Sequence, residues 1–363
     1  MKKVIHISAR ADLGGGPRHI QYLLNKILLA IDCYIACPDQ KPFIDIYESI
    51  LNKNKIHIIP FRSLSLNSLF TLRRFIRHND IDIIHCHGKG AAVYGKLLKF
   101  LNRRLLLVYT PHGIHVDSYS PFQKKLYKLY EFVSSNLFNH IIYVSKSEAD
   151  QARRESLFSK CNYTIIPNGV PELKQSNFYD KNSLKESLFK HPKNKLIVTL
   201  SRFDFQKNMA ETFQIALSMP QYNFLWIGDG PDFKELQEKL ESEGISNINM
   251  IGTKDVVAEY LLASDLYLST ARWEGMPLAL LEALSAGLPI VASNVVGNKD
   301  VVSEDVGYLY ELHNIDDAIH KIEMAFEKDF SNVDIKKFFF DNFSSDKMAN
   351  DVLKIYSNLK NGN

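Results

Sequence analysis

The sequence has little cysteine and no long apolar run, and both shortages limit what the protein can be. Four cysteines stand at irregular spacing among 363 residues, which excludes the disulfide framework of a small secreted domain and fits a reducing compartment. The densest apolar stretches, 105–109 and 278–284, are far shorter than the roughly 18–20 residues of a membrane-spanning helix. The apolar part of the N-terminus is too short for a signal peptide. We therefore expect a cytoplasmic protein.

Recognisable metal and nucleic-acid motifs are missing as well. The run His85-Cys86-His87 has the residue types of a zinc site, but zinc takes about four convergent ligands and the usual paired Cys and His spacings are absent. We expect no bound metal and no other cofactor. No nucleic-acid-binding motif is found, so nucleic acid is not an expected partner.

Charge is divided unevenly between the two halves. Residues 1–170 hold 24 Lys and Arg against 12 Asp and Glu, whereas the remainder holds 20 against 29. Basic residues alternate with apolar ones at 96–104 and 124–128. Two interpretations stay open for these blocks: a solvated helix face, or docking to an anionic membrane surface, where each basic residue contributes about 1 kcal/mol.

Short aliphatic or β-branched segments alternate with longer helical patterns along the chain. Strands are predicted at 4–8, 33–37, 56–60, 81–85, 105–109, 140–144 and 164–166, and then at 196–201, 223–227, 249–251, 265–269 and 289–292. This alternation indicates parallel sheets with helices on both faces. We predict an α/β protein with two Rossmann-like, doubly wound domains: an N-terminal domain at 1–172, a polar linker at 173–194 and a C-terminal domain at 195–340.

The strongest local signal is the segment 269–283. A strand ends at Thr270, a turn containing Gly275 follows, and Pro277 opens a helix that Gly287 closes. Backbone N–H groups at such a helix start are a ready site for phosphate. Glu274 and Glu282 could bind sugar hydroxyls; alternatively, Glu274 is an acid favoured by the helix dipole and Glu282 an exposed helix residue.

A second signal follows the strand at 196–201. Arg202 and Lys207 would stand at the carboxyl edge of the second sheet, where a guanidinium and an ammonium suit a diphosphate. Two solvated surface charges are the plainer interpretation.

In the first half, glycines and histidines follow strands. Gly15 and Gly16 lie where backbone can approach a ligand closely, although the run lacks the dinucleotide-binding spacing. His85 and His87 alternate at one strand end and share a face, and His112 follows another strand. The carboxyl edge of an open α/β sheet is where such folds bind ligands.

Together these motifs resemble the retaining glycosyltransferases of the two-Rossmann GT-B fold, specifically family 4. The resemblance spans nearly the whole chain. It is most specific at Glu274 to Glu282, then at Arg202 to Lys207, and then at Ile166-Pro167-Asn168-Gly169-Val170.

The resemblance implies a role for each matching position. Arg202 and Lys207 would hold the donor diphosphate, Glu274 the donor sugar and Glu282 the ribose hydroxyls. The backbone lining the sugar and phosphates would come from Gly275, Met276, Pro277 and Leu278. Gly15 and Gly16 would face the diphosphate across the cleft between the domains, and His112 would lie near the reacting sugar. His85 and His87 are weaker candidates on the acceptor side.

The resemblance also implies metal-independent transfer with retention, and a C-terminal helix at 341–363 that returns to the first domain. The expected donor is a UDP-sugar, with GDP-mannose second, and the sugar a hexose or N-acetylhexosamine. The acceptor would be a glycan or lipid-linked saccharide of bacterial surface polysaccharide, reached from the inner face of the cell membrane. Asn208 departs from the family, where many relatives have glycine after the lysine.

Two other functions remain to be weighed. An NAD-dependent oxidoreductase would also use Rossmann domains, but the third glycine and the acidic partner of that motif are absent. A catalytically silent partner subunit would have no need of Arg202, Lys207, Glu274 and Glu282 together.

Overall fold

The computed structural model describes residues 2–12, 14–114, 116, 119–174 and 180–359. The chain divides into two compact units. Unit 1 comprises Met1–Gly169 and Ser345–Asn363, and unit 2 comprises Val170–Ser344. Each unit has its own sheet and its own core.

Unit 1 is built on a seven-stranded parallel sheet with the order β3-β2-β1-β4-β5-β6-β7. Its strands are β1 (Lys3–Ser8), β2 (Asp32–Cys37), β3 (Ile56–Ile58), β4 (Ile83–His87), β5 (Leu106–Thr110), β6 (His140–Tyr143) and β7 (Tyr163–Ile165). The helices are α1 (Gly15–Ile27), α2 (Phe43–Ile50), α3 (Leu66–His78), α4 (Gly88–Leu101), α5 (Pro121–Ser134), α6 (Lys146–Arg154) and α14 (Ser345–Asn358).

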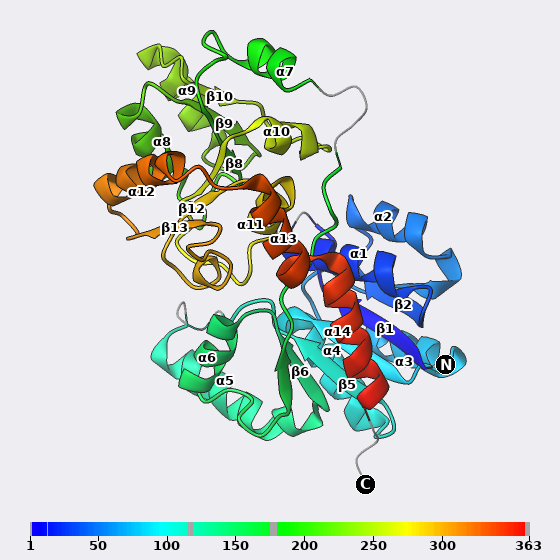
Figure 1. Ribbon diagram of the computed structural model, residues 1–363. Coiled ribbons are helices and arrows are strands. Elements are labelled where there is room, and N and C mark those ends of the chain that lie inside the picture. Colours follow the sequence, from blue (N-terminus) through cyan, green and yellow to red (C-terminus); the bar gives the residue numbers. More distant parts are fainter. Residues whose placement is uncertain (1, 13, 115, 117–118, 175–179, 360–363) are drawn as a thin grey trace. The chain divides into compact units, whose positions relative to one another are not determined.

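Neighbouring residues on the central strands of unit 1 enter opposite cores. Val4 and Ile83 pack in a core with α1, α2 and α14, whereas Ile5 and Ile84 pack in the core on the side of α3 and α4. Strands covered on both faces need apolar residues at nearly every position, which explains the continuous apolar runs in the sequence. Figure 1 shows α14, in red, alongside the blue α1, with which it packs.

The C-terminal helix belongs to unit 1 by its contacts. Met348, Val352 and Tyr356 are buried on one face of α14, in the core that also contains residues of α1. Lys2 Nζ donates to the carbonyl oxygens of Tyr356 and Leu359, at 2.9 and 2.8 Å. A cation suits that end of a helix, where carbonyls lack partners and the dipole is negative.

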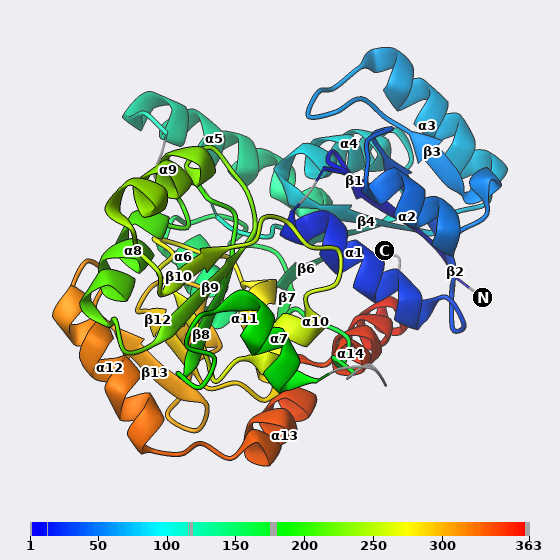
Figure 2. The ribbon, with the colours of Figure 1, turned by 90° about the horizontal axis from the view of Figure 1, so that it is seen from above.

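Unit 2 is built on a six-stranded parallel sheet with the order β10-β9-β8-β11-β12-β13. Its strands are β8 (Leu196–Leu200), β9 (Asn223–Ile227), β10 (Ile248–Met250), β11 (Leu266–Ser269), β12 (Ile290–Ser293) and β13 (Gly307–Tyr310). Its helices are α7 (Lys181–Leu188), α8 (Met209–Ser218), α9 (Phe233–Glu243), α10 (Ala258–Ala263), α11 (Leu278–Ala286), α12 (Ile315–Glu327) and α13 (Asn332–Phe343). Figure 2 shows α8 and α12 on one side of this sheet and α7, α10 and α11 on the other.

The architecture confirms the prediction of two Rossmann-like α/β sheets, and two details differ from the sequence-based expectation. The segment 173–194, predicted as a linker, contains α7 and is counted with unit 2. Asp265 anchors this helix, because its carboxylate accepts from Lys185 Nζ at 2.7 Å and from Lys181 Nζ at 3.1 Å. Strand β13 was not predicted, since its four residues begin with glycine and carry no clear strand pattern.

Helix α5 is attached to α4 by a buried ion pair. Lys96 Nζ lies 2.6 Å from a carboxylate oxygen of Glu131, and both side chains are buried. The same ammonium donates to Ser134 Oγ at 2.8 Å and lies 4.3 Å from the ring centroid of Tyr130. Breaking such a pair costs about 3–5 kcal/mol, because it leaves a buried charge without a partner. One face of α5 is thereby fixed against α4.

Candidate functional site

In unit 2, the loop after β8 carries the two predicted cations. Arg202 Nε donates to Asp204 in a short contact, and the Arg202 side chain is 52% exposed. Asp204 Oδ1 also accepts from the backbone N–H of Lys207 at 3.1 Å. The Lys207 side chain is only 22% exposed. The interpretation of both cations as solvated surface charges therefore fails for Lys207, whereas Arg202 keeps an open face.

Two glycines in the loop after β9 leave room for the loop that carries Arg202. Gly228 has φ +142, and a Cβ there would lie 1.8 Å from the carbonyl oxygen of Ser201. A Cβ on Gly230 would lie 2.3 Å from the carbonyl oxygen of Phe203. Phe203 N–H in turn donates to the Asp229 carbonyl at 3.0 Å. The sequence Gly228-Asp229-Gly230 thus supports the loop that presents Arg202.

The loop after β11 brings Glu274 to the same edge of the sheet. Glu274 N–H donates to the Val296 carbonyl at 3.0 Å. The next loop approaches so closely that a Cβ on Gly297, at φ +90, would lie 2.6 Å from Glu274 Cβ. That loop is itself fixed by Asn298, whose side-chain amide donates to the Ser293 carbonyl at 3.1 Å. The sequence analysis did not single out Gly297 and Asn298. The signal that could have found them is a glycine shortly after the apolar strand β12.

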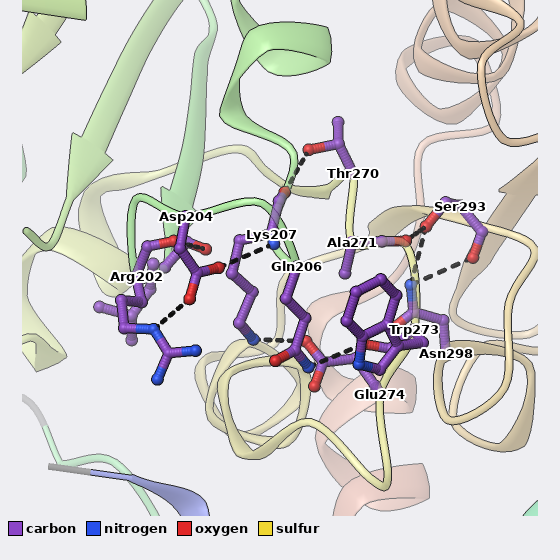
Figure 3. Close-up of polar contacts among 12 residues, drawn as sticks. Arg202, Asp204, Gln206, Lys207, Thr270, Ala271, Trp273, Glu274, Ser293 and Asn298 are labelled. Carbon is purple, nitrogen blue, oxygen red and sulfur yellow. Dashed lines mark hydrogen bonds and ion pairs between the residues drawn. The ribbon is translucent and has the colours of Figure 1, made fainter. Parts of the chain in front are cut away.

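Lys207 and Glu274 meet in an ion pair, which joins the two loops. Lys207 Nζ and Glu274 Oε1 are in short contact, and the Glu274 side chain is 9% exposed. Figure 3 shows Lys207 and Gln206 both reaching across to the β11 loop, where the Gln206 amide donates to the Trp273 carbonyl at 2.9 Å. Thr270 Oγ1 donates to the Lys207 carbonyl at 3.0 Å. Residues 67 positions apart are thus held as one polar cluster.

Helix α11 provides the remaining predicted groups. It begins at Leu278 directly after Pro277 and ends at Gly287, which adopts a left-handed conformation with φ 80, as predicted. Met276 and Leu278 are buried, and Gly275 lies in the turn between Glu274 and the helix. Glu282 is 5% exposed. Its interpretation as an exposed helix residue is therefore wrong.

A small pocket lies at this edge. Residues of β8, of β11 and of the first turn of α11 line it, together with Lys207 and Glu274. The Leu280 N–H donates to the Pro277 carbonyl at 3.2 Å, whereas the first N–H groups of a helix generally lack intrahelical partners, so the pocket combines an ammonium, a carboxylate and helix amides. An anion with hydroxyl groups attached has the complementary chemistry.

Asn208, the departure from the family, has a local explanation. It adopts a left-handed conformation with φ 57 just before α8, which asparagine tolerates better than most residues do. Its side-chain amide donates to Glu211 at 2.6 Å. Glu211 is buried and also accepts from the Tyr310 hydroxyl at 2.7 Å. Asn208 therefore replaces glycine with an additional anchor for the Lys207 loop.

In unit 1, the glycines at the start of α1 leave open space. A Cβ placed on Gly15 or Gly16 would have no atom of the described residues within 4 Å. Neither glycine is required by packing within the part of unit 1 that the structure describes. Their expected contact with a diphosphate stays a prediction.

Five histidines gather around the carboxyl edge of the unit 1 sheet. His6, His19, His85 and His87 are buried, and His112 is half-buried. His85 is engaged on both ring nitrogens: Nδ1 lies 2.6 Å from the Tyr356 hydroxyl and Nε2 lies 2.8 Å from Thr110 Oγ1. His87 contacts His6 and His112. His85 thus ties α14 to the sheet, and its expected acceptor-side role, like that of His87, stays a prediction.

His112 sits on a constrained backbone. Its φ is 57, in the left-handed region. The next N–H, that of Gly113, donates to the buried carboxylate of Glu148 in a short contact. The other Glu148 oxygen accepts from Val144 N–H at 2.8 Å. Sequence inspection missed Glu148, which lies 35 residues from the glycine it holds, and it missed His6 and His19 because they lie in an apolar strand and helix.

Burial keeps these histidines neutral. Desolvation lowers the pKa of His6 to about 3 and that of His19 to about 4. The pKa values of His85, His87 and His112 fall well below their usual range, again chiefly through burial. A charged imidazole is disfavoured in a low-dielectric interior.

Geometry alone would admit a metal ion among these rings. Ring nitrogens lie within 4.8 Å of one another in two groups, His6 with His85 and His87, and His19 with His87 and His112. The closest ring-nitrogen pairs, at 3.1 Å, also have the separation of hydrogen bonds between neutral imidazoles. The expected absence of a metal stays a prediction.

The comparisons with known proteins match both halves of the chain. Residues 13–172 match the family profile Glycosyltransferase Family 4, and residues 180–358 match Glycosyl transferases group 1. The chain is a two-domain glycosyltransferase. The alternative function, that of an NAD-dependent oxidoreductase, is thereby excluded.

The relatives of this glycosyltransferase include enzymes of surface polysaccharides. An Escherichia coli UDP-Gal:alpha-D-GlcNAc-diphosphoundecaprenol alpha-1,3-galactosyltransferase is 27% identical, over 88% of this chain and 87% of that protein. An O-antigen biosynthesis glycosyltransferase of the same species is 23% identical, with 92% of each chain covered. The crystal structure of Anabaena HepE with UDP and glucose has a TM-score of 0.85 at 16% identity and covers 99% of this chain and 100% of that one. This likeness confirms the GT-B fold.

The buried histidines predict that unit 1 loses stability in mild acid. In the unfolded chain these groups would bind protons near pH 6.5, whereas in the folded chain they stay neutral to lower pH. Stability is therefore full above pH 6.5 and falls below it, by about 1.4 kcal/mol per pH unit for each such histidine at most.

Thermal unfolding can follow the two units separately, because both tryptophans, Trp226 and Trp273, lie in unit 2. Tryptophan fluorescence follows the unfolding of unit 2, and far-UV circular dichroism follows both units. Between pH 7.5 and 5.5, the transition seen only by circular dichroism, that of unit 1, should move to a much lower temperature, whereas the transition seen by fluorescence should move little. Midpoints that do not change with pH would contradict the neutral, buried assignment.

Proposed function

We propose that this glycosyltransferase moves a hexose or N-acetylhexosamine from a nucleotide-sugar to a lipid-linked saccharide, with retention at the anomeric carbon, in bacterial surface polysaccharide synthesis. The observation that carries the proposal is the joined Lys207–Glu274 pair at the edge of β8 and β11, beside the start of α11. A UDP-sugar is the favoured donor and GDP-mannose the second. The Escherichia coli relative named for UDP-Gal and the HepE structure with UDP support this order.

Each residue of the site has a role in binding the donor. Arg202 and Lys207 bind the diphosphate, with the amides of the first turn of α11 as further donors. Glu274 binds sugar hydroxyls, and the buried Glu282 binds the ribose. Gly275, Met276, Pro277 and Leu278 line the sugar and phosphates, and in unit 1 Gly15 and Gly16 approach the diphosphate.

The chemistry depends on charge developing at the leaving phosphate. Without the donor, Lys207 is paired with Glu274; with the donor, its ammonium can also face a phosphate oxygen that gains charge as the glycosidic bond breaks. The acceptor oxygen bonds to the anomeric carbon on the face that the phosphate leaves, and the leaving phosphate takes the hydroxyl proton, which gives retention. We propose that this occurs without a metal ion, and that His112 lies near the reacting sugar as a hydrogen-bonding group.

Substitution of Lys207 and Glu282 should separate catalysis from binding. Lys207→Ala should lower kcat about 100-fold, because a donor to the developing charge is lost, and should weaken binding of free nucleotide less. Glu282→Ala should weaken nucleotide-sugar binding about tenfold through loss of the ribose contact.

Initial rates over a range of donor concentrations, with a polyprenyl-diphosphate saccharide as acceptor, measure both effects. Proton NMR of the product reports the anomeric configuration. Lys234→Ala and Glu238→Ala, an exposed ion pair on α9, are the matched controls and should behave as wild type. Unchanged kinetics in both site variants would refute the site assignment, and an inverted product would refute retention.

For the acceptor side, we propose that α5 lies on the anionic inner face of the cell membrane. The apolar residues Phe122, Leu126, Leu129 and Val133 follow a helical 4-3-4 spacing and are 75, 58, 58 and 69% exposed. The buried Lys96–Glu131 pair fixes the opposite face of α5. Among the helices of the described residues, none is long and apolar enough to cross a bilayer.

Charge around this stripe supports an anionic lipid surface. Lys125 is exposed beside it, three residues after Phe122 and four before Leu129. Lys124 and Lys128 lie on the other side of α5, where both pair with Glu155 at 2.7 and 2.9 Å. Lys160 Nζ lies 4.6 Å from the ring centroid of Phe132, which is also exposed. An exposed apolar helix face with basic residues beside it is typical of interfacial helices, which bury that face at the level of the lipid headgroups. A lipid-linked acceptor would be reached there.

Glutamate on this stripe should release the protein from membranes. Leu126→Glu combined with Leu129→Glu should reduce co-sedimentation with vesicles of phosphatidylglycerol and phosphatidylethanolamine at least tenfold, because the apolar contact is replaced by like charge. Val256→Glu combined with Val333→Glu, at sites of unit 2 exposed to 63 and 75%, is the control for added charge. If both double variants sediment with the vesicles to the same extent as wild type, the proposed contact of α5 with the membrane is wrong.

A further inference from the structure

Three of the histidines form a continuous chain of hydrogen bonds. His6 Nδ1, on β1, lies 3.1 Å from His87 Nε2 at the end of β4. His87 Nδ1 lies 3.1 Å from His112 Nε2, just beyond β5. The rings of His87 and His112 are stacked, with centroids 5.4 Å apart. The chain thus runs from the core of unit 1 to the half-buried His112.

The two hydrogen bonds that link His6, His87 and His112 must run in the same direction. A neutral imidazole has one N–H donor and one acceptor nitrogen, and His87 uses both of its nitrogens within the chain. Either His6 donates to His87 and His87 donates to His112, or both bonds run the opposite way. The two directions place opposite tautomers on all three rings.

The inner end of the chain favours one direction. His6 Nε2 is buried and has no hydrogen-bond partner among the residues that the structure describes. If the chain ran inward from His112, this atom would carry a buried N–H without an acceptor. If the chain ran outward, it would carry only a lone pair, and orphaned buried N–H groups are rarer than under-satisfied acceptors.

We infer that His6 and His87 are positioning residues that hold His112 as the neutral Nδ1–H tautomer, so that His112 offers a hydrogen-bond donor to an oxygen atom of a bound ligand. In this arrangement His112 Nε2 accepts from His87 and Nδ1 carries the proton. The consequence for catalysis rests on the proposed function, in which His112 lies near the reacting sugar. The tautomer itself does not depend on that function.

Neighbouring groups hold the three hydrogen-bonded histidines in place. The Glu148 carboxylate holds the backbone of Gly113 and Val144, which fixes the origin of the His112 side chain. Burial lowers the pKa of all three rings, so none is protonated twice near neutral pH. An ion coordinated by His87 would have to displace one of its two histidine contacts.

The tautomer can be measured on the unaltered protein. Long-range 15N–1H correlation spectra of protein labelled at the histidine rings distinguish the two neutral tautomers, and the spectrum of His112→Gln assigns the His112 signals by their loss. The inference predicts a protonated Nδ1 and an unprotonated Nε2 at pH 7.5. A His112 ring protonated at Nε2 would overturn it.

Substitutions at His87 test the coupling. His87→Leu removes the donor, and His112 should then lose its Nδ1–H preference while kcat falls about tenfold at nearly constant KM for the nucleotide-sugar. His87→Asn keeps an amide donor near the Nδ1 position and should restore both the tautomer and most of kcat. An unchanged His112 tautomer in folded His87→Leu would overturn the inference.

The tautomer of His112 and the activity of His112→Ala together distinguish a failure of the inferred tautomer from a failure of the proposed function. If His112 has the predicted tautomer but His112→Ala transfers sugar at the wild-type rate, the histidine chain stands and the placement of His112 near the reacting sugar is wrong. If His112→Ala is inactive and the wild-type tautomer is reversed, the proposed function stands and the direction of the chain is wrong.

Discussion

The ion pair between Lys207 and Glu274 is the contact on which the unit 2 site depends. It fixes the loop after β8 against the loop after β11, and the neighbouring residues serve that contact. Gly297 gives Glu274 the room it needs, and Asn208 holds the start of α8 through Glu211. A partly buried pair of this kind needs surrounding hydrogen bonds to offset the desolvation of its charges. The pair therefore holds the two loops together, and under the proposed function a phosphate of the donor would share Lys207 with Glu274.

The two units carry different polar groups at the carboxyl edges of their parallel sheets. In unit 2 the carboxyl edge has full charges, namely Arg202, Lys207 and the acids beside them. In unit 1 the corresponding edge has neutral imidazoles, held neutral by burial. Charged groups and helix amides suit phosphates, whereas neutral donors and acceptors suit the hydroxyls of a sugar. Under the proposed function, the charged groups of unit 2 would bind the diphosphate and the imidazoles of unit 1 would bind hydroxyl groups.

Local patterns in the sequence predicted most strands of both sheets, and they placed Arg202, Lys207 and Glu274 in loops that follow strands of unit 2. Strand β9 lies at the predicted residues, and Pro277 and Gly287 bound α11 as expected, because strand propensity, proline and glycine act locally. Contacts between distant segments could not be predicted. The pairing of Lys207 with Glu274 spans 67 residues and that of His6 with His87 spans 81. Helix α7 lies in a polar segment and was not predicted; its Lys181 and Lys185 bind Asp265, about 80 residues away.

Calorimetric titration of the purified protein with UDP, GDP and NAD, each with and without EDTA, tests whether the protein binds a nucleoside diphosphate without a metal ion. We predict that one nucleoside diphosphate, UDP before GDP, binds with the same affinity in the presence and absence of EDTA, and that NAD does not bind. Binding of NAD alone, binding that EDTA abolishes, or no binding of either diphosphate would contradict a metal-independent diphosphate site at Arg202 and Lys207.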